Sequence, residues 1–116
     1  MKVICYDRLR EGVTMDQVRP YLLEETTHAW TLWKKGVIRE NYARADVAGV
    51  VIVFEAKNSA EALSYLAGFP LSKAGLIEWF AIPVVAPLPL EAMFGPEAQG
   101  IVAIPDTEQE WAAESS

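Results

Sequence analysis

The sequence predicts an α+β protein with the element order βαββαβ, a ferredoxin-like protomer. Runs of β-branched and aromatic residues at 2–8, 37–44, 50–56 and 76–82 have the composition of strands. Two helical patterns lie between the first and second strands and between the third and fourth. The run 50–56 is apolar on both alternating faces, which is typical of a strand in the middle of a sheet.

The first helical segment begins after a turn at Glu11-Gly12. Thr14 and Gln17 have the spacing of a capping box. Pro20 lies too deep to be the first residue of that helix, which leaves two alternatives. Either the helix kinks there, or a short turn ends near Val18 and the main helix restarts with Pro20 at its first position. The main helix then runs to about Lys35.

One face of this helix is predicted to pack on the sheet, and Gly36 is expected just after its end. Helical spacing places these residues on the buried stripe: Val18, Leu22, Thr26, Ala29 and Trp33. Leu23 and Trp30 widen the stripe on one flank. Tyr21 and Leu32 lie on the other flank, with Glu25 and His28 close by.

The second half repeats the pattern of strand and helix. A turn at 46–49 precedes the central strand, and Asn58 caps a second helix with Glu61 at its third position. A break is expected at 69–71. The last strand, 76–82, is expected to end at Pro83.

A sheet that is apolar on both faces must cover the face that the helices leave open. A second subunit would cover it, so we expect a homodimer or higher homo-oligomer in which two sheets face each other. We expect this body to span residues 1–94. Residues 95–116 form an acidic tail that holds five acids and no base, whereas 1–94 holds ten bases and eleven acids. Its apolar island, 101–104, favours packing on the body or on a partner; ordering by lattice contact is the alternative.

Composition excludes several classes of protein. Cys5 is the one cysteine, which rules out an intrachain disulfide and a cysteine-based zinc cluster. No metal-ligand spacing, phosphate loop or nucleotide fingerprint occurs, so we expect no metal and no cofactor. The net charge of −6, with no basic stripe, argues against nucleic acid. The longest apolar run, about eight residues, is too short to span a membrane, and no targeting segment is visible, so we expect a cytoplasmic protein without membrane partners.

His28 is the side chain whose ordinary pKa lies nearest to neutrality. Glu24 and Glu25 lie four and three residues before it, so either carboxylate could orient the imidazole as in a proton-transfer site. The alternative is a surface histidine paired with helix carboxylates.

Charged side chains also occur within the predicted strands, and those near strand centres need partners or a wet cavity: Arg39, Glu40 and Glu78. A cavity with arginine and aromatic walls would suit a small carboxylate or enolate. An ion-pair network between subunits explains the same charges.

Aromatic side chains are the remaining candidates for a pocket wall. Most are expected in the core or at a dimer contact, and one or two could line a site for a flat ligand: Tyr6, Tyr42, Trp30, Trp33 and Trp79. Cys5 is expected to be a small buried apolar side chain rather than a nucleophile.

Two segments together resemble the muconolactone isomerase-like family of dimeric α/β-barrel proteins, over residues 2 to about 94: Glu25…His28-Ala-Trp30…Gly36-Val-Ile-Arg39-Glu40…Tyr42…Arg44, and Phe69-Pro70-Leu71…Ala74-Gly75-Leu76-Ile77. The resemblance implies a ferredoxin-like protomer, an eight-stranded barrel made by two subunits, and no cofactor. It also implies proton transfer on a small unsaturated lactone acid.

The sequence therefore favours an enzyme: a cofactor-independent isomerase, cyclase or lyase acting on a small acidic or enolisable molecule. His28 would be the base, assisted by Glu25, and Arg39 or Arg44 would hold the anion. Tyr6, Trp30, Tyr42 and Trp79 would bind the substrate. Two alternatives stay open. One is a non-catalytic dimeric binding or assembly module, and the other is a cofactor-free monooxygenase or polyketide cyclase of the same barrel class.

Overall fold

A computed structural model describes residues 1–87 of the chain. The chain divides into two units, Met1–Pro83 and Val84–Ser116. The first carries the fold, and only residues 84–87 of the second are described. The expected boundary at 94 and the acidic tail 95–116 lie outside the described residues.

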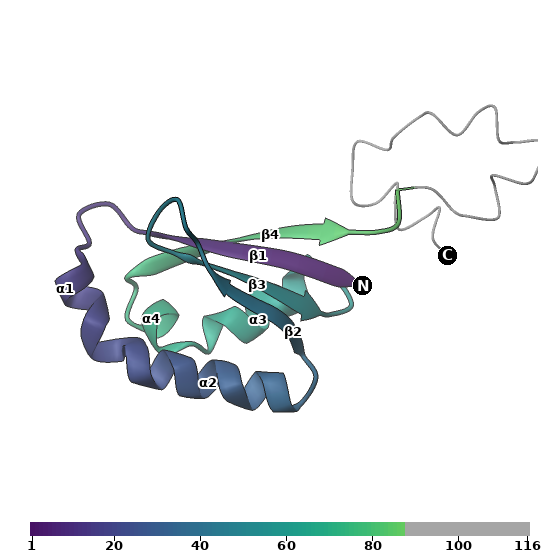
Figure 1. Ribbon diagram of the computed structural model, residues 1–116, viewed down its shortest axis with the longest axis horizontal. Helices are drawn as coiled ribbons and strands as arrows, with labels where there is room; N and C mark the ends of the chain where they lie inside the picture. Colours follow the sequence, from purple (N-terminus) through teal and green to yellow (C-terminus); the bar gives the residue numbers. More distant parts are fainter. Residues whose placement is uncertain (88–116) are drawn as a thin grey trace, which may run out of the picture. The chain divides into compact units, whose positions relative to one another are not determined.

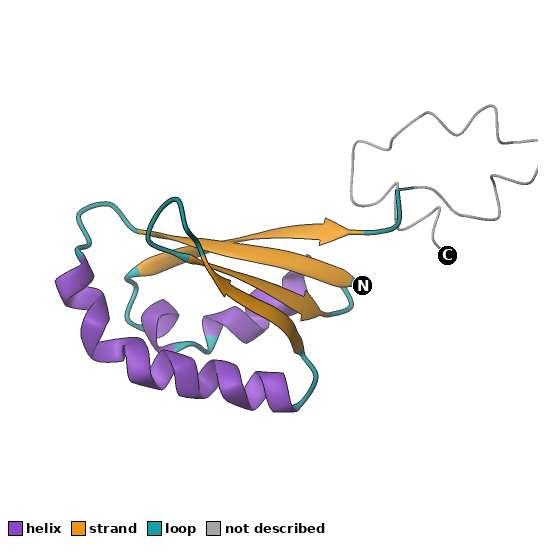
Figure 2. Ribbon diagram, in the orientation of Figure 1, coloured by secondary structure: helices purple, strands orange, loops and turns teal. Residues whose placement is uncertain are grey.

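The described part is an α+β protein with one four-stranded antiparallel sheet in the order β2-β3-β1-β4. Its strands are β1 (Lys2–Leu9), β2 (Ile38–Ala43), β3 (Val50–Glu55) and β4 (Ile77–Val84). Its helices are α1 (Met15–Val18), the 3₁₀ turn η1 (Arg19–Tyr21), α2 (Leu22–Lys34), α3 (Ser59–Ala67) and α4 (Pro70–Lys73). Helices α2, α3 and α4 lie against one face of the sheet (Figures 1 and 2). The predicted ferredoxin-like order and the inner position of the third strand are confirmed.

Local capping signals fix three of the helix ends. The amide of Thr14 donates to Gln17 Oε1 at 2.8 Å, which confirms the capping box. Asn58 Oδ1 accepts from the amide of Glu61 at 2.9 Å and starts α3 as predicted. Gly36 has a φ of +77°, so it ends α2 in the left-handed conformation that favours glycine.

The structure agrees with the second alternative in part, because the first helix ends at Val18 but the main helix α2 starts at Leu22 and not at Pro20. Helix α1 ends at Val18, and Pro20 lies in the first turn of η1, where a missing amide proton costs no helix hydrogen bond. Two other expectations were wrong. The segment expected as a break holds α4, which starts with Pro70 at its first position. Pro83 lies inside β4 instead of ending it, because β4 is an edge strand and one side of its backbone needs no ladder partner.

The buried face of α2 also differs from the predicted stripe. Leu23 is 80% exposed and Trp30 is 56% exposed, and Leu22 and Trp33 are exposed as well. Val18 and Ala29 of the predicted stripe are buried, and Leu32 of the flank is buried with them, while Glu25 and His28 are half-buried. The prediction was wrong for Leu22 and Trp33, because helical spacing does not show that the polar side chain of Glu25 finds a partner in the Leu71 amide on the inner flank.

Alternation along the strands divides the sheet into two faces, as predicted. The helix-facing side contains the core, with Val3, Cys5, Ile52, Phe54 and Leu66 fully or almost fully buried. The second face carries partly exposed apolar side chains and the stacked pair Tyr6 and Phe80, whose ring centroids lie 5.2 Å apart. The helix-facing side is also where a cavity remains.

Candidate functional site

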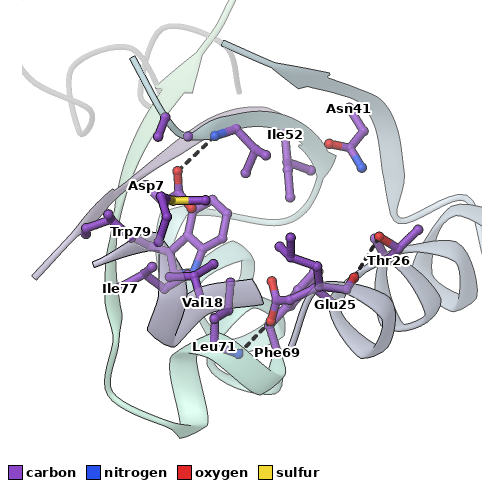
Figure 3. Close-up of a pocket in the computed structure, with 17 residues that line it drawn as sticks. Asp7, Val18, Glu25, Thr26, Asn41, Ile52, Phe69, Leu71, Ile77 and Trp79 are labelled. Atoms are coloured by element: carbon purple, nitrogen blue, oxygen red, sulfur yellow. Dashed lines mark hydrogen bonds between the residues drawn. The ribbon is translucent and has the colours of Figure 1, made fainter. Parts of the chain in front are cut away.

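A cavity of about 190 Å³ lies between the sheet and helix α2. Side chains from all four strands, from α1, α2 and α4, and from the loop between β2 and β3 line it (Figure 3). Most of the wall is apolar, and two carboxylates reach it from different elements: Asp7 from β1 and Glu25 from α2. The buried carboxyl group of Asp7 and the half-buried one of Glu25 meet at this apolar cavity, which is the candidate site.

Asp7 continues the inward-facing positions of β1, after Val3 and Cys5. Its side chain is only 8% exposed, and its Oδ1 accepts a hydrogen bond from the amide of Val50 at 2.9 Å. Burial raises the pKa of Asp7 above its usual range, while the Val50 amide and the positive charge of Arg44 oppose this shift. Asp7 therefore retains a proton at higher pH than an exposed aspartate.

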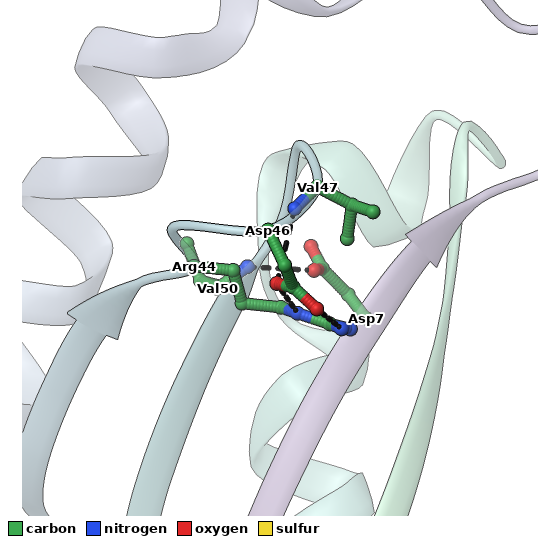
Figure 4. A network of polar contacts seen from close by, with 5 residues as sticks. All are labelled: Asp7, Arg44, Asp46, Val47 and Val50. Carbon is green, nitrogen blue, oxygen red and sulfur yellow. Dashed lines mark hydrogen bonds and ion pairs between the residues drawn. The ribbon is translucent and has the colours of Figure 1, made fainter.

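The loop between β2 and β3 holds Asp7 in place (Figure 4). Arg44 binds Asp46 through two contacts, from Nε to Oδ1 at 2.8 Å and from Nη2 to Oδ2 at 2.6 Å. The amide of Arg44 also donates to the Gly49 carbonyl at 2.9 Å, which closes the loop. A Cβ on Gly49 would lie 2.9 Å from Asp7 Oδ1, so the absence of a side chain there lets the loop approach the carboxylate.

Glu25 enters from the opposite layer. Helix α4 has no side-chain cap of its own, and Glu25 Oε1 accepts a hydrogen bond from the amide of Leu71, in its first turn, at 2.6 Å. Burial raises the pKa of Glu25, the Leu71 amide lowers it, and the negative charge of Asp7 raises it further. The two carboxylates are therefore electrostatically linked across the cavity.

Aromatic side chains form another part of the wall. Phe69 is buried, and its ring centroid lies 6.3 Å from that of Trp79. The indole Nε1 of Trp79 donates to Ser72 Oγ at 3.0 Å, which satisfies its polar edge and fixes the ring. The cavity thus presents a rigid aromatic surface beside the two acids.

His28 lies on α2 outside the lining of this cavity. Its ring makes an edge-to-face contact with Phe69, with centroids 4.5 Å apart and an angle of 71°. Burial, followed by the positive charges of Lys73 and Lys35, lowers the pKa of His28. The predicted assistant, Glu25, directs its carboxylate to Leu71, and so the structure separates the two members of the expected pair.

Of the predicted site residues, Glu25 and Trp79 line the cavity. Arg39 lies in a separate shallow hollow of the surface with Lys2, Glu40 and Glu55. Arg44 is outside the lining and is engaged by Asp46.

The predicted aromatic residues other than Trp79 lie elsewhere. Tyr6 stacks on the second face of the sheet. Tyr42 is exposed and donates to Glu40 at 2.6 Å, which together with the negative charge of Glu40 raises the pKa of the phenol. Trp30 is exposed on the outer side of α2, with the Lys34 ammonium 5.9 Å from its ring centroid.

The sequence-based analysis missed Asp7, Gly49 and Asn41 as parts of the site. Asn41 pairs with Ile52 in the strand register and faces the cavity (Figure 3). For Asp7 a signal was present, because it shares the inward parity of Val3 and Cys5. Gly49 has no comparable signal, since its role depends on how a loop meets a distant strand.

No other class of site is evident in the part of the chain that is described. Across residues 1–87, no three histidine, cysteine or acidic side chains gather in a way that could hold a metal ion. Among the described helices, none has both the length and the apolar character needed to cross a membrane.

Comparison with known proteins supports the fold. No family model and no curated protein matches the chain. Among solved structures, it is similar to 5-chloro-2-hydroxyhydroquinone dehydrochlorinase (TftG) from Burkholderia phenoliruptrix AC1100, in complex with 2,5-dihydroxybenzoquinone: TM-score 0.57, 20% identity, 73% of this chain and 94% of that one. It is also similar to muconolactone isomerase, with a TM-score of 0.60 at 16% identity over 74% of this chain and 90% of that one. At these identities the likeness shows a shared ferredoxin-like fold.

The class that fold and site define is an α+β protein with the fold of these two enzymes and an acid-lined cavity under its sheet. Carboxyl groups with raised pKa values in an apolar space can take up and release protons at higher pH than exposed carboxyl groups. Each of the two is held by a backbone amide, which fixes its orientation.

Proposed function

We propose that the chain is a cofactor-independent enzyme of the isomerase, cyclase or lyase type that transfers a proton on a small enolisable molecule. The observation that carries this proposal is the pair Asp7 and Glu25, two carboxyl groups with raised pKa values that line one apolar cavity. The fold shared with an isomerase and a dehydrochlorinase supports an enzymatic role.

Glu25 is the proposed base. Its Oε1 is fixed by the amide of Leu71, which leaves the rest of the carboxylate to face a bound molecule. The charged carboxylate would remove a proton from a carbon next to a carbonyl, and the electron pair of the broken C–H bond would form an enolate. Return of that proton to a different carbon completes an isomerisation with no net change in protons or electrons.

Asp7 is the proposed partner acid. Because its negative charge raises the pKa of Glu25, the pair binds a first proton more readily than either group would alone. In the microstate of the singly protonated pair that has the proton on Asp7, Asp7 can donate a hydrogen bond to the developing enolate oxygen while Glu25 acts as the base. His28 then supports the site by packing on Phe69 rather than by taking the proton.

We place a homodimer contact on the second face of the sheet. That face carries the stacked pair Tyr6 and Phe80, and the Arg8 guanidinium lies 4.9 Å from the Phe80 ring centroid while its Nε contacts Glu78 at 2.5 Å. Two such faces would form the barrel that the sequence predicts, with the expected strand charges at the interface.

The test uses α-angelica lactone, a β,γ-unsaturated butenolide, in D₂O. NMR follows deuterium incorporation and migration of the double bond. Glu25→Gln keeps an acceptor for the Leu71 amide but removes the base, so the rate should fall by about 10²–10⁴-fold. Glu24→Gln, one residue away and exposed, is the matched control and should retain the wild-type rate. A Glu25→Gln variant as fast as Glu24→Gln would eliminate Glu25 as the base.

A non-catalytic binding module is the second candidate. It is favoured by the structural use of both acids, since each accepts a hydrogen bond from a backbone amide in a distant segment of the chain. Saturable binding of the lactone with no exchange above the buffer rate would select this candidate.

A further inference from the structure

The charged groups that line the cavity all have one sign. Asp7 and Glu25 are the ionisable members of the lining, and within the described residues no lysine, arginine or histidine belongs to it. Thr26 adds acceptor character, because its hydroxyl proton is donated to the Leu22 carbonyl at 2.9 Å and its lone pairs remain. When both carboxyl groups are ionised, the cavity is therefore rich in acceptors and has negative charge.

The nearby cations do not reverse this sign. Arg44 acts on Asp7 from outside the lining, but both of its contacts are made to Asp46, which neutralises it locally. The positive charges of Lys73 and Lys35 lower the pKa of His28, which lies outside the cavity lining. Burial is the largest influence on the pKa values of both cavity carboxyl groups, and it raises them. An additional anion would increase this cost in a medium of low dielectric.

The cavity is open on one side, where Leu22, Thr26 and Asn41 are exposed, and its inner part has room for a small ring. Its volume is about 190 Å³, and an apolar cavity of roughly 150 Å³ accommodates benzene. Phe69 and Trp79 offer aromatic surface on which a flat ring can pack. One ring with a small substituent fits this space.

We propose that the cavity selects an uncharged single-ring molecule, most tightly one that donates hydrogen bonds to Asp7 and Glu25, and that it rejects a carboxylate of the same size. This proposal rests on the proposed function, because it names the substrate class of the same site. It changes one expectation drawn from the sequence, in which Arg39 or Arg44 would hold an anion. Neither arginine lines the cavity.

Three ligands of nearly identical shape test the proposal: benzamide, which is neutral with N–H donors; nitrobenzene, which is neutral without donors; and benzoate, which is an anion. Binding is measured by isothermal titration calorimetry with the full chain at pH 8. We expect benzamide to bind about tenfold or more tightly than nitrobenzene and more than tenfold more tightly than benzoate. Glu25→Gln and Asp7→Asn should each reduce the preference for benzamide over benzoate by about tenfold. Glu24→Gln should leave it unchanged.

Benzoate binding as tightly as benzamide to the wild-type protein would overturn the proposal, whatever the variants do. So would a preference that Glu25→Gln and Asp7→Asn leave intact, or a failure of all three rings to bind. The deuterium-exchange assay is independent of these results. Exchange together with tight benzoate binding would refute the ligand class alone, and benzamide selectivity without exchange would refute the catalytic role alone.

Discussion

Substitution of Gly49 by alanine tests whether the loop between β2 and β3 positions Asp7. Gly49 does not occupy the left-handed region, so the backbone accepts alanine. The new Cβ would lie 2.9 Å from Asp7 Oδ1 and 3.5 Å from Arg44 Cδ. The first contact is too close, and the carboxylate has to move.

The cost follows from the bond that this movement disturbs. Asp7 Oδ1 is the atom that accepts from the Val50 amide at 2.9 Å, and a hydrogen bond to a charged group contributes roughly 1.5–3 kcal/mol. Replacement of glycine by alanine at a compatible backbone position contributes about 0.4–1 kcal/mol in the opposite sense. We therefore expect a net loss of about 1–2 kcal/mol, and a domain of this size loses about 4–8 °C in Tm per kcal/mol.

Thermal unfolding followed by circular dichroism measures the effect. Gly68→Ala is the matched control, because its nearest contact would be 3.4 Å, to the Tyr65 carbonyl, and its φ is −80°. We expect Gly68→Ala to unfold near the wild-type temperature. A Gly49→Ala protein as stable as Gly68→Ala would refute the claim that the loop packs directly on Asp7.

Three further predictions concern the core and the wall of the cavity. Phe54→Ala removes a side chain with 0% exposure and should lower the free energy of unfolding by about 3–5 kcal/mol in urea titrations, whereas a loss below about 1 kcal/mol would contradict the burial. Cys5 is buried, and burial raises the pKa of its thiol to about 11, so Ellman's reagent at pH 8 should label it only after denaturation; rapid labelling of the native protein would contradict this. A double-mutant cycle of Trp79→Phe and Ser72→Ala should give a coupling of about 1 kcal/mol, and additive effects would show that the 3.0 Å bond contributes nothing.

Several elements could be predicted from sequence because their signals are local. Thr14 with Gln17 and Asn58 with Glu61 fix helix starts within four residues of chain. Gly36 needs only its own backbone conformation to end α2. Strand geometry alone places Trp79 and Phe80 of β4 on opposite faces of the sheet.

Features that depend on distant parts of the chain could not be predicted in the same way. Pro83 is tolerated inside β4 because that strand lies at the sheet edge, which only the strand order reveals. The orientation of α2 depends on Glu25 reaching Leu71, 46 residues further along the chain. Helical spacing also placed Trp33 on the inner face, although it is 46% exposed, because spacing alone does not register that a polar side chain will find a partner.

The pH dependence of deuterium exchange in α-angelica lactone, measured for the wild type and Glu25→Gln, tests most directly whether Glu25 is the base. A carboxyl group with a raised pKa is ionised only above that pKa, so the wild-type rate should fall as the pH drops through it. The account predicts a half-maximal rate at a pH above 4.5, the ordinary pKa of glutamate, and loss of this acid limb in Glu25→Gln. A wild-type limb at or below 4.5, or the same limb in both proteins, would contradict it.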